Sequence, residues 1–154
     1  MKLTPHFTLD ELIRSDDAKR FGIDNVPTTE HLANLQVLAL GLEQARLLLG
    51  CPMVVTSGYR CPELNTRIYA EAGKPATNSA HSLGFAADFH CYDAKRDFRP
   101  PLVKSARSLQ NLIVYDQLIY EPGRCVHISF DPRLRMQVMT QRVIGGPTVQ
   151  GIVE

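Results

Sequence analysis

The sequence predicts an α+β fold, in which helices pack against a small antiparallel sheet. Helical patterns come first along the chain, and short β-prone runs dominate later. Strands and helices do not alternate regularly, which argues against a doubly wound parallel sheet. With 154 residues and 44% hydrophobic content, the chain is long enough to bury one core. We therefore expect a single domain over residues 1–154, without internal repeats.

The strongest helical pattern spans residues 29–49. Apolar side chains recur there every three or four positions, and Gly50 follows as a C-terminal stop. Near the start of the chain, Thr8 and Glu11 form a capping box, which indicates a short helix. The polar stretch at residues 14–24 is expected to form a loop. The remaining expected helices span residues 8–15, 62–72 and 100–111.

The second half of the chain contains most of the strand patterns. Pro122 and Gly123 separate two short β-prone runs, which indicates a hairpin. The polar segments 73–78 and 92–99 are expected to be loops. The tail, residues 145–154, contains glycines and a proline and is expected to be loosely held. Strands are expected at residues 53–56, 85–90, 117–121, 125–130 and 135–144.

The pattern of the hairpin also predicts its register. After the turn, apolar and polar side chains alternate, so that His127 shares a face with Cys125 and Ser129. A three-residue turn places Glu121 opposite Cys125 and Ile119 opposite His127. The apolar faces of the two strands then match, and Glu121 and His127 lie on the same face. A two-residue turn would put them on opposite faces and mix core residues with polar ones.

Two histidines and a carboxylate form a candidate metal site. His81 precedes Asp88 by seven residues, and the run between them is small and apolar. A histidine by itself is more often structural than a ligand, but a carboxylate inside an apolar strand must be paired or coordinated. With His127 as third ligand, the set matches catalytic zinc, which takes three protein ligands and a water molecule. Glu121 would then act as general base.

The bulk composition argues against several other functions. A net charge of +1 without long charged runs gives no electrostatic case for binding nucleic acid or a membrane surface. No signal peptide is evident at the N-terminus, and apolar stretches are far shorter than the roughly 20 residues of a membrane span. We expect synthesis in the cytoplasm. Four cysteines without a Cys-x-x-Cys pair are expected to be reduced thiols: Cys51, Cys61, Cys91 and Cys125.

Three motifs, in this order, resemble a known family. They are Ser-Gly-Tyr-Arg at residues 57–60, Ser-x-His-x-x-Gly-x-Ala-x-Asp at residues 79–88, and His-x-Ser at residues 127–129. The segment of about residues 54–130 is similar to zinc peptidases that cleave cell-wall peptides. These include D-alanyl-D-alanine carboxypeptidases and the L-alanyl-D-glutamate endopeptidases of phage lysins. The segment at residues 7–12 and the long helix look like the phage-type or prophage-type branch.

The resemblance implies a fold and a role for each matching residue. The fold would be that of the hedgehog/DD-peptidase group. One Zn²⁺ per chain would be bound by His81, Asp88 and His127. Arg60 would contact the substrate or steady the transition state. The other substrate-binding residues would be Ser79 and Tyr59.

One position departs from the family pattern. Several members carry the catalytic carboxylate three residues before the last histidine, and here that position is Arg124. Glu121, six residues before His127, is the natural substitute in the predicted register. If that register were wrong, Asp116 or Asp131 would be the remaining candidates. Arg124, like Arg60, could supply a cation for a developing oxyanion.

The expected function is hydrolysis of peptidoglycan stem peptides by a zinc peptidase. Without a signal peptide, the protein would suit a lysin of a phage or prophage that acts on the cell wall, and we expect a monomer. The main alternative is a non-catalytic zinc-containing module of the same fold that binds a cell-wall peptide or a protein partner. A plain α+β domain with structural histidines is the third possibility.

Overall fold

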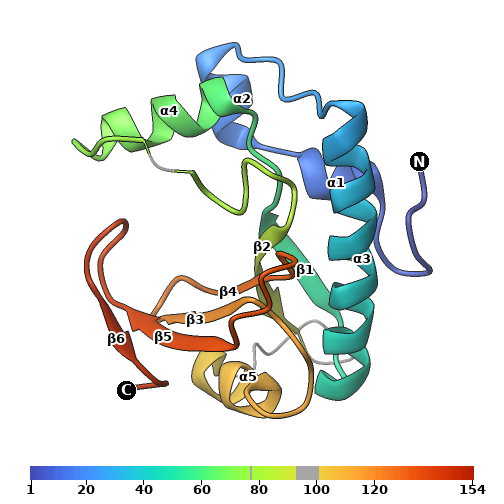
Figure 1. The fold of residues 1–154 in the computed structure, drawn as a ribbon, viewed down its shortest axis with the longest axis vertical. Helices are drawn as coiled ribbons and strands as arrows, with labels where there is room; N and C mark the ends of the chain where they lie inside the picture. The colour runs from blue at the N-terminus through green and yellow to red at the C-terminus, as the bar shows by residue number, and fades with distance from the viewer. Residues whose placement is uncertain (77, 93–100) are drawn as a thin grey trace.

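A computed structural model of the protein describes residues 1–76, 78–92 and 101–154. Most of the loop expected at residues 92–99, together with Pro100, lies outside the described residues. The α+β prediction is confirmed, because helices pack around one six-stranded sheet with strand order β1-β2-β4-β3-β5-β6. Figure 1 shows α3 along one side of the sheet, α5 beneath it, and α1, α2 and α4 together at the opposite end.

The expected helices are present, and one helix was not expected. α2 lies within the stretch that we predicted to be a loop. Its ends are well capped, because the Ser15 side chain accepts from the Ala18 backbone N–H and Gly22 adopts a left-handed conformation. Only Ala18 of this helix is buried, so no apolar periodicity marks it in the sequence. The helices are α1 (Leu9–Ile13), α2 (Asp16–Phe21), α3 (Thr29–Leu49), α4 (Pro62–Glu71) and α5 (Leu102–Leu109).

The sheet confirms the predicted hairpin register. β3 and β4 pair with Glu121 opposite Cys125 and Ile119 opposite His127. The strands are β1 (Met53–Ser57), β2 (Ala86–Cys91), β3 (Gln117–Glu121), β4 (Cys125–Ser129), β5 (Gln137–Gln141) and β6 (Thr148–Gln150).

The prediction of an antiparallel sheet is wrong for one pair, since β5 runs parallel to β3. β4 ends beside the start of β3, and residues 130–136 cross that end of the sheet. The backbone N–H of Gln137 then donates to the carbonyl of Asp116, so β5 starts where β3 starts. The two strands therefore run in the same direction.

The expectation of a loose tail is also wrong. β6 pairs with β5, and the buried hydroxyl of Thr140 fixes the residues after it. Thr140 Oγ1 donates to the Gly151 carbonyl at 2.7 Å and accepts from the Val153 N–H at 2.9 Å. These contacts connect residues more than ten positions apart, so local composition did not reveal them.

The sheet separates the core from a polar face. Leu118, Ile128 and Phe89 are fully buried on the side that packs against α3 and α5. Because side chains alternate along strands, Asp88 and His127 project from the other face. All four cysteines are free, as expected. Among the described helices, none combines the length and the apolar character that crossing a membrane requires.

Replacing Thr140 by valine tests how the tail is held. The change keeps the side-chain shape but removes both hydrogen bonds, so we expect the free energy of unfolding to fall by about 1–3 kcal/mol. Urea denaturation measures the effect. Thr148→Val, at an exposed threonine of β6, is the control and should change stability little. Equal stability of the two variants would show that Thr140 does not fix the tail.

Candidate metal centre

Three potential ligand atoms converge on the polar face of the sheet. Asp88 in β2 is the direct cross-strand partner of His127 in β4, and His81 approaches from the turn before β2. His127 Nδ1 lies 2.9 Å from Asp88 Oδ1, and His81 Nε2 lies 3.2 Å from His127 Nδ1 and 3.3 Å from Asp88 Oδ1. One ligand atom from each residue lies within 4.8 Å of the others, so the group could hold a metal ion.

A hydrogen bond outside the cluster orients His81. Its Nδ1 lies 2.7 Å from the carbonyl oxygen of Gly58. A carbonyl can only accept, so Nδ1 carries the proton and Nε2 directs its lone pair at Asp88 and His127. Burial, together with the Arg60 charge, lowers the pKa of His81 to about 4. The imidazole is therefore neutral at pH 7, the form in which histidine binds zinc.

The Asp88 carboxylate is held in its charged form. Burial by itself would raise the pKa of Asp88, but the charges and hydrogen bonds of His81 and His127 hold it well below the ordinary value. Arg60 Nη2 donates to Asp88 Oδ2 at 3.1 Å, and the same guanidinium contacts Ser57 Oγ. Oδ2 is thus occupied by Arg60, and Oδ1 faces the histidines. Two imidazoles and one carboxylate match the ligands that zinc prefers.

The backbone around Gly58 brings this carbonyl to His81. A Cβ atom at position 58 would collide with the backbone oxygen of Leu12 in α1, so only glycine fits. The next residue continues the contact, because the Tyr59 N–H donates to the same Leu12 oxygen at 2.8 Å. Gly84, with φ of +80°, makes the turn between His81 and β2. The N-terminal helix α1 therefore supports the candidate ligand His81 indirectly.

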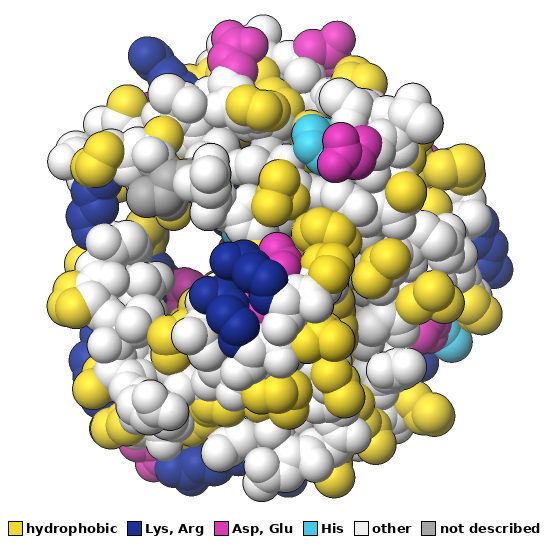
Figure 2. Space-filling view, in the orientation of Figure 1, with side chains coloured by type: hydrophobic (Ala, Val, Ile, Leu, Met, Phe, Trp, Pro, Cys, Tyr) yellow, Lys and Arg dark blue, Asp and Glu magenta, His cyan; other side chains and the backbone are white. Residues whose placement is uncertain are grey.

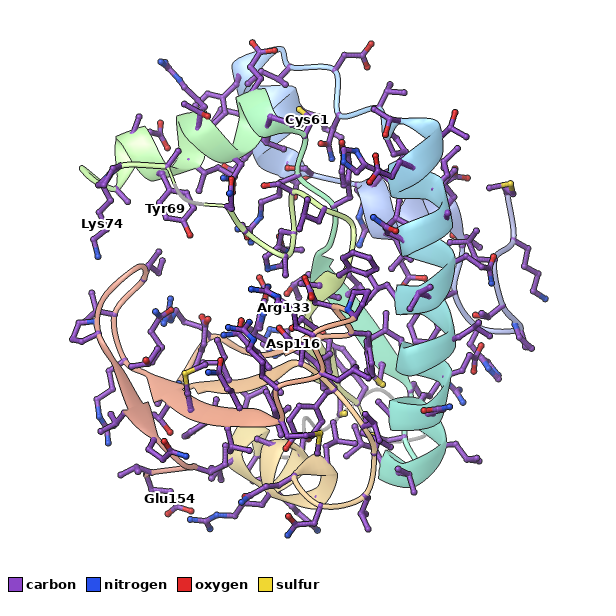
Figure 3. The ribbon with its side chains drawn as sticks, viewed as in Figure 1. Cys61, Tyr69, Lys74, Asp116, Arg133 and Glu154 are labelled. Carbon is purple, nitrogen blue, oxygen red and sulfur yellow. The ribbon has the colours of Figure 1, made fainter. Side chains whose placement is uncertain are left out.

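The ligand cluster opens into a cleft of about 740 Å³. α2 and α4 line one wall, and β3, β4 and the turn between β5 and β6 line the other. The space-filling view shows the cleft as a hollow bordered by basic side chains (Figure 2). Tyr69 and Lys74 point from the end of α4 toward this hollow (Figure 3). Lys74 Nζ reaches the opposite wall and donates to the Ile144 carbonyl at 2.9 Å.

Glu121 lines the same cleft, on the face that bears His127. Burial, and secondarily the charge of Asp88, raise the pKa of Glu121. Arg124 Nη1 lies 3.1 Å from Glu121 Oε2, and Arg124 Nη2 donates to the Gln141 carbonyl at 3.0 Å. The arginine at the unusual position therefore contacts the carboxylate that is the candidate base.

The other two candidate bases are already engaged. Asp116 is fully buried and accepts two hydrogen bonds from the guanidinium of Arg135. Asp131 is also buried and is paired in the same way with Arg133. Neither carboxylate lines the cleft among the described residues, whereas Glu121 does. The geometry therefore favours Glu121.

The predicted substrate-binding residues occupy different environments. Arg60 and Ser79 line the cleft, and Ser79 Oγ accepts from the His81 N–H at 3.2 Å. Tyr59 is only 1% exposed, and its hydroxyl lies 2.8 Å from Nδ1 of the half-buried His31. The ring does not line the cleft, so the position of Tyr59 does not support the predicted contact with substrate. The motif places Tyr59 next to the site in sequence, but its side chain fills the core.

The sequence reasoning also missed residues of the cleft. Arg133, Arg135 and Lys74 line it, although no motif marks them. Arg135 was expected only as the first residue of a strand. A charged residue in a loop or strand end carries no pattern that tells whether it faces solvent or a site, and the walls of this cleft come from segments far apart in the chain.

A His-Asp-His cluster and a glutamate that line one cleft form an arrangement that metal-dependent hydrolases use. Comparison with known families agrees with this class. The sequence model described as Peptidase M15 matches residues 5–129, and the chain belongs to this family. The matched segment includes all three candidate ligands and Glu121. The α+β architecture fits the hedgehog/DD-peptidase fold of this family. A comparison with curated proteins found no match.

Replacing Gly58 by alanine tests the backbone support of His81. The new Cβ would collide with the Leu12 oxygen, so we expect a loss of about 2 kcal/mol or more in the free energy of unfolding. The control is Gly123→Ala at the hairpin turn, where there is open space and only the positive φ of +72° opposes a side chain. Thermal unfolding compares them, and a Gly58 variant no less stable than the control would contradict the close contact.

Proposed function

We propose that this protein is a zinc metallopeptidase that hydrolyses peptide bonds in peptidoglycan stem peptides. The observation that carries the proposal is the convergence of His81, Asp88 and His127 beside Glu121 on one face of the sheet. The proposed activity is of the D-Ala-D-Ala carboxypeptidase or the L-Ala-D-Glu endopeptidase type. It would serve a lysin of a phage or prophage acting on the cell wall, and the protein would act as a monomer.

His81, Asp88 and His127 would hold one zinc ion per chain. A zinc ion bound there would polarise the substrate carbonyl and lower the pKa of a water molecule. The protein's own contribution is to keep the ligand set ready. Gly58 fixes the His81 tautomer, and Arg60 fixes which oxygen of Asp88 faces the site. Little rearrangement is then needed when the metal binds.

Glu121 would act as the general base. Its carboxylate accepts a proton from the attacking water and returns it to the leaving amine. Its raised pKa brings the carboxyl closer to the pH at which it can both accept and donate a proton. Arg124 holds the carboxylate in place. Arg60 has two functions in this scheme: it supports Asp88, and it provides a cation for the developing oxyanion.

A second candidate function is a non-catalytic zinc module that binds a cell-wall peptide or a protein partner. The ion pair between Arg124 and Glu121 favours it, because a carboxylate that is engaged by a guanidinium is a weaker base. The two candidates share the metal and the cleft. They differ in whether peptide bonds are cut.

Metal analysis tests the site itself. We expect about one zinc per purified chain, and His81→Ala should abolish most of the bound metal because a catalytic zinc needs all three protein ligands. His6→Ala is a matched control, since His6 is an exposed histidine that contacts Glu43. Inductively coupled plasma mass spectrometry measures the zinc content of each protein after dialysis. A native protein without metal would contradict both candidate functions.

Replacing Glu121 by glutamine separates the two candidates. We expect the zinc to stay and the release of amino groups from purified peptidoglycan to fall by about 100-fold or more. In the native protein, kcat/KM should fall as the pH drops through the raised pKa of Glu121, because a protonated carboxyl cannot accept the proton.

The control for this experiment is Glu30→Gln on the exposed start of α3. Activity that survives in Glu121→Gln would mean that another group is the base. A native protein that is inactive on every type of cell wall would favour the non-catalytic module. Mass spectrometry of the fragments released from a defined muropeptide would identify the bond that is cut.

A further inference from the structure

The segment between β4 and β5 has a costly backbone conformation. Leu134 and Met136 adopt φ values of +45° and +54°, and no other non-glycine residue among those the structure describes has a positive φ. A left-handed conformation is unfavourable for residues with a Cβ and persists only where the surrounding structure holds it. The residues that alternate with them are Arg133 and Arg135. Both arginines line the same cleft.

Buried carboxylates hold both guanidinium groups rigidly. Arg133 Nε and Nη2 donate to the two oxygens of Asp131 at 2.8 and 3.1 Å. Arg135 Nε and Nη2 donate to the two oxygens of Asp116 at 2.8 and 2.6 Å. Arg133 Nη2 also lies 3.8 Å from Asp116 Oδ2, so the two ion pairs are in contact. Figure 3 shows Arg133 and Asp116 beside each other at the edge of the gap below α4.

The outer sides of the two arginines remain accessible. Their side chains are 56% and 34% exposed, and both line the cleft into which His81, Asp88 and His127 open. In the part of the chain that the structure describes, the Nη1 groups donate to no protein acceptor. A cluster of basic side chains is visible beside the hollow in Figure 2. The Nη1 groups of Arg133 and Arg135 are thus available to donate hydrogen bonds to a ligand in the cleft.

We propose that Arg133 and Arg135 form a subsite that binds a carboxylate group of the peptide substrate. This inference rests on the proposed function and adds a specific recognition element to it. A guanidinium held on one edge by a carboxylate presents its remaining donors in a fixed geometry that suits a second, planar carboxylate. Asp116 and Asp131 neutralise much of the positive charge, which disfavours a doubly charged phosphate. Both arginines lie beyond residues 5–129, which the family model matches.

Stem peptides contain carboxylates of two kinds, on side chains and at the chain end, and the test distinguishes them. The probe is the pentapeptide L-Ala-γ-D-Glu-L-Lys-D-Ala-D-Ala, compared with its α-carboxamide at the glutamate and with its C-terminal amide. Binding is measured by calorimetry to zinc-loaded Glu121→Gln protein, in which turnover is suppressed. We expect amidation of the recognised carboxylate to weaken binding about tenfold.

In the same Glu121→Gln background, Arg133→Gln should abolish the preference for the free carboxylate over its amide. Arg133→Lys should restore only part of this preference, because an ammonium group cannot donate two parallel hydrogen bonds to a carboxylate as a guanidinium does. Arg135 is left intact, since its loss would leave the fully buried Asp116 carboxylate without its cationic partner. The double variant Arg133→Gln/Asp131→Asn does not leave a buried carboxylate without its cationic partner, and it should bind the three peptides as Arg133→Gln does. Arg142→Gln is the control, because Arg142 contacts the Glu154 carbonyl and does not line the cleft.

An undiminished preference for the free carboxylate in Arg133→Gln would overturn the subsite, and so would failure to bind any of the three peptides. Hydrolysis by the native protein is measured in parallel. A native protein that cuts nothing, but whose preference depends on Arg133, would refute the proposed activity and support the subsite. A native protein that hydrolyses the acid and the amides equally, with or without Arg133, would support the activity and refute the subsite.

Discussion

The pairing of β2 with β4 is the constraint on which the candidate site depends. Asp88 and His127 are direct cross-strand partners, so the backbone ladder sets the distance between their side chains. A shift by one residue would turn one of them into the core. The same ladder places Ala87 and Ile128 on the buried face. The packing energy of the core thus also fixes the relative positions of Asp88 and His127 on the polar face.

His81 is attached to this frame from outside the sheet. Its position depends on a chain of contacts that begins at the Leu12 oxygen, passes through Gly58 and ends at the imidazole. Helix α1, which carries no candidate ligand, therefore matters for the metal centre. The N-terminal part of the chain thus supports the candidate site, although none of its residues takes part in the proposed chemistry.

The sequence predicted the hairpin register and the long helix, and it singled out the three candidate ligands that converge in the structure, because each leaves a local pattern: residue type, alternation or helical spacing. Other features depend on distant contacts. α2 is held by caps and buries little, and Thr140 and residues near 151–153 meet only in the folded chain. Tyr59 follows a site motif but fills the core. The arginine pair is set by an unusual backbone and by buried acids that no spacing rule connects to it.

If the protein acts on peptidoglycan, as we propose, the contact between Lys74 and Ile144 affects how the polymer reaches the candidate site. The two residues belong to opposite walls, so their hydrogen bond closes a loop of protein around part of the cleft. A peptide with a free end can be threaded through such a loop, whereas a strand anchored at both ends in a cross-linked mesh must first break it. One hydrogen bond between exposed groups is weak, so the loop can open.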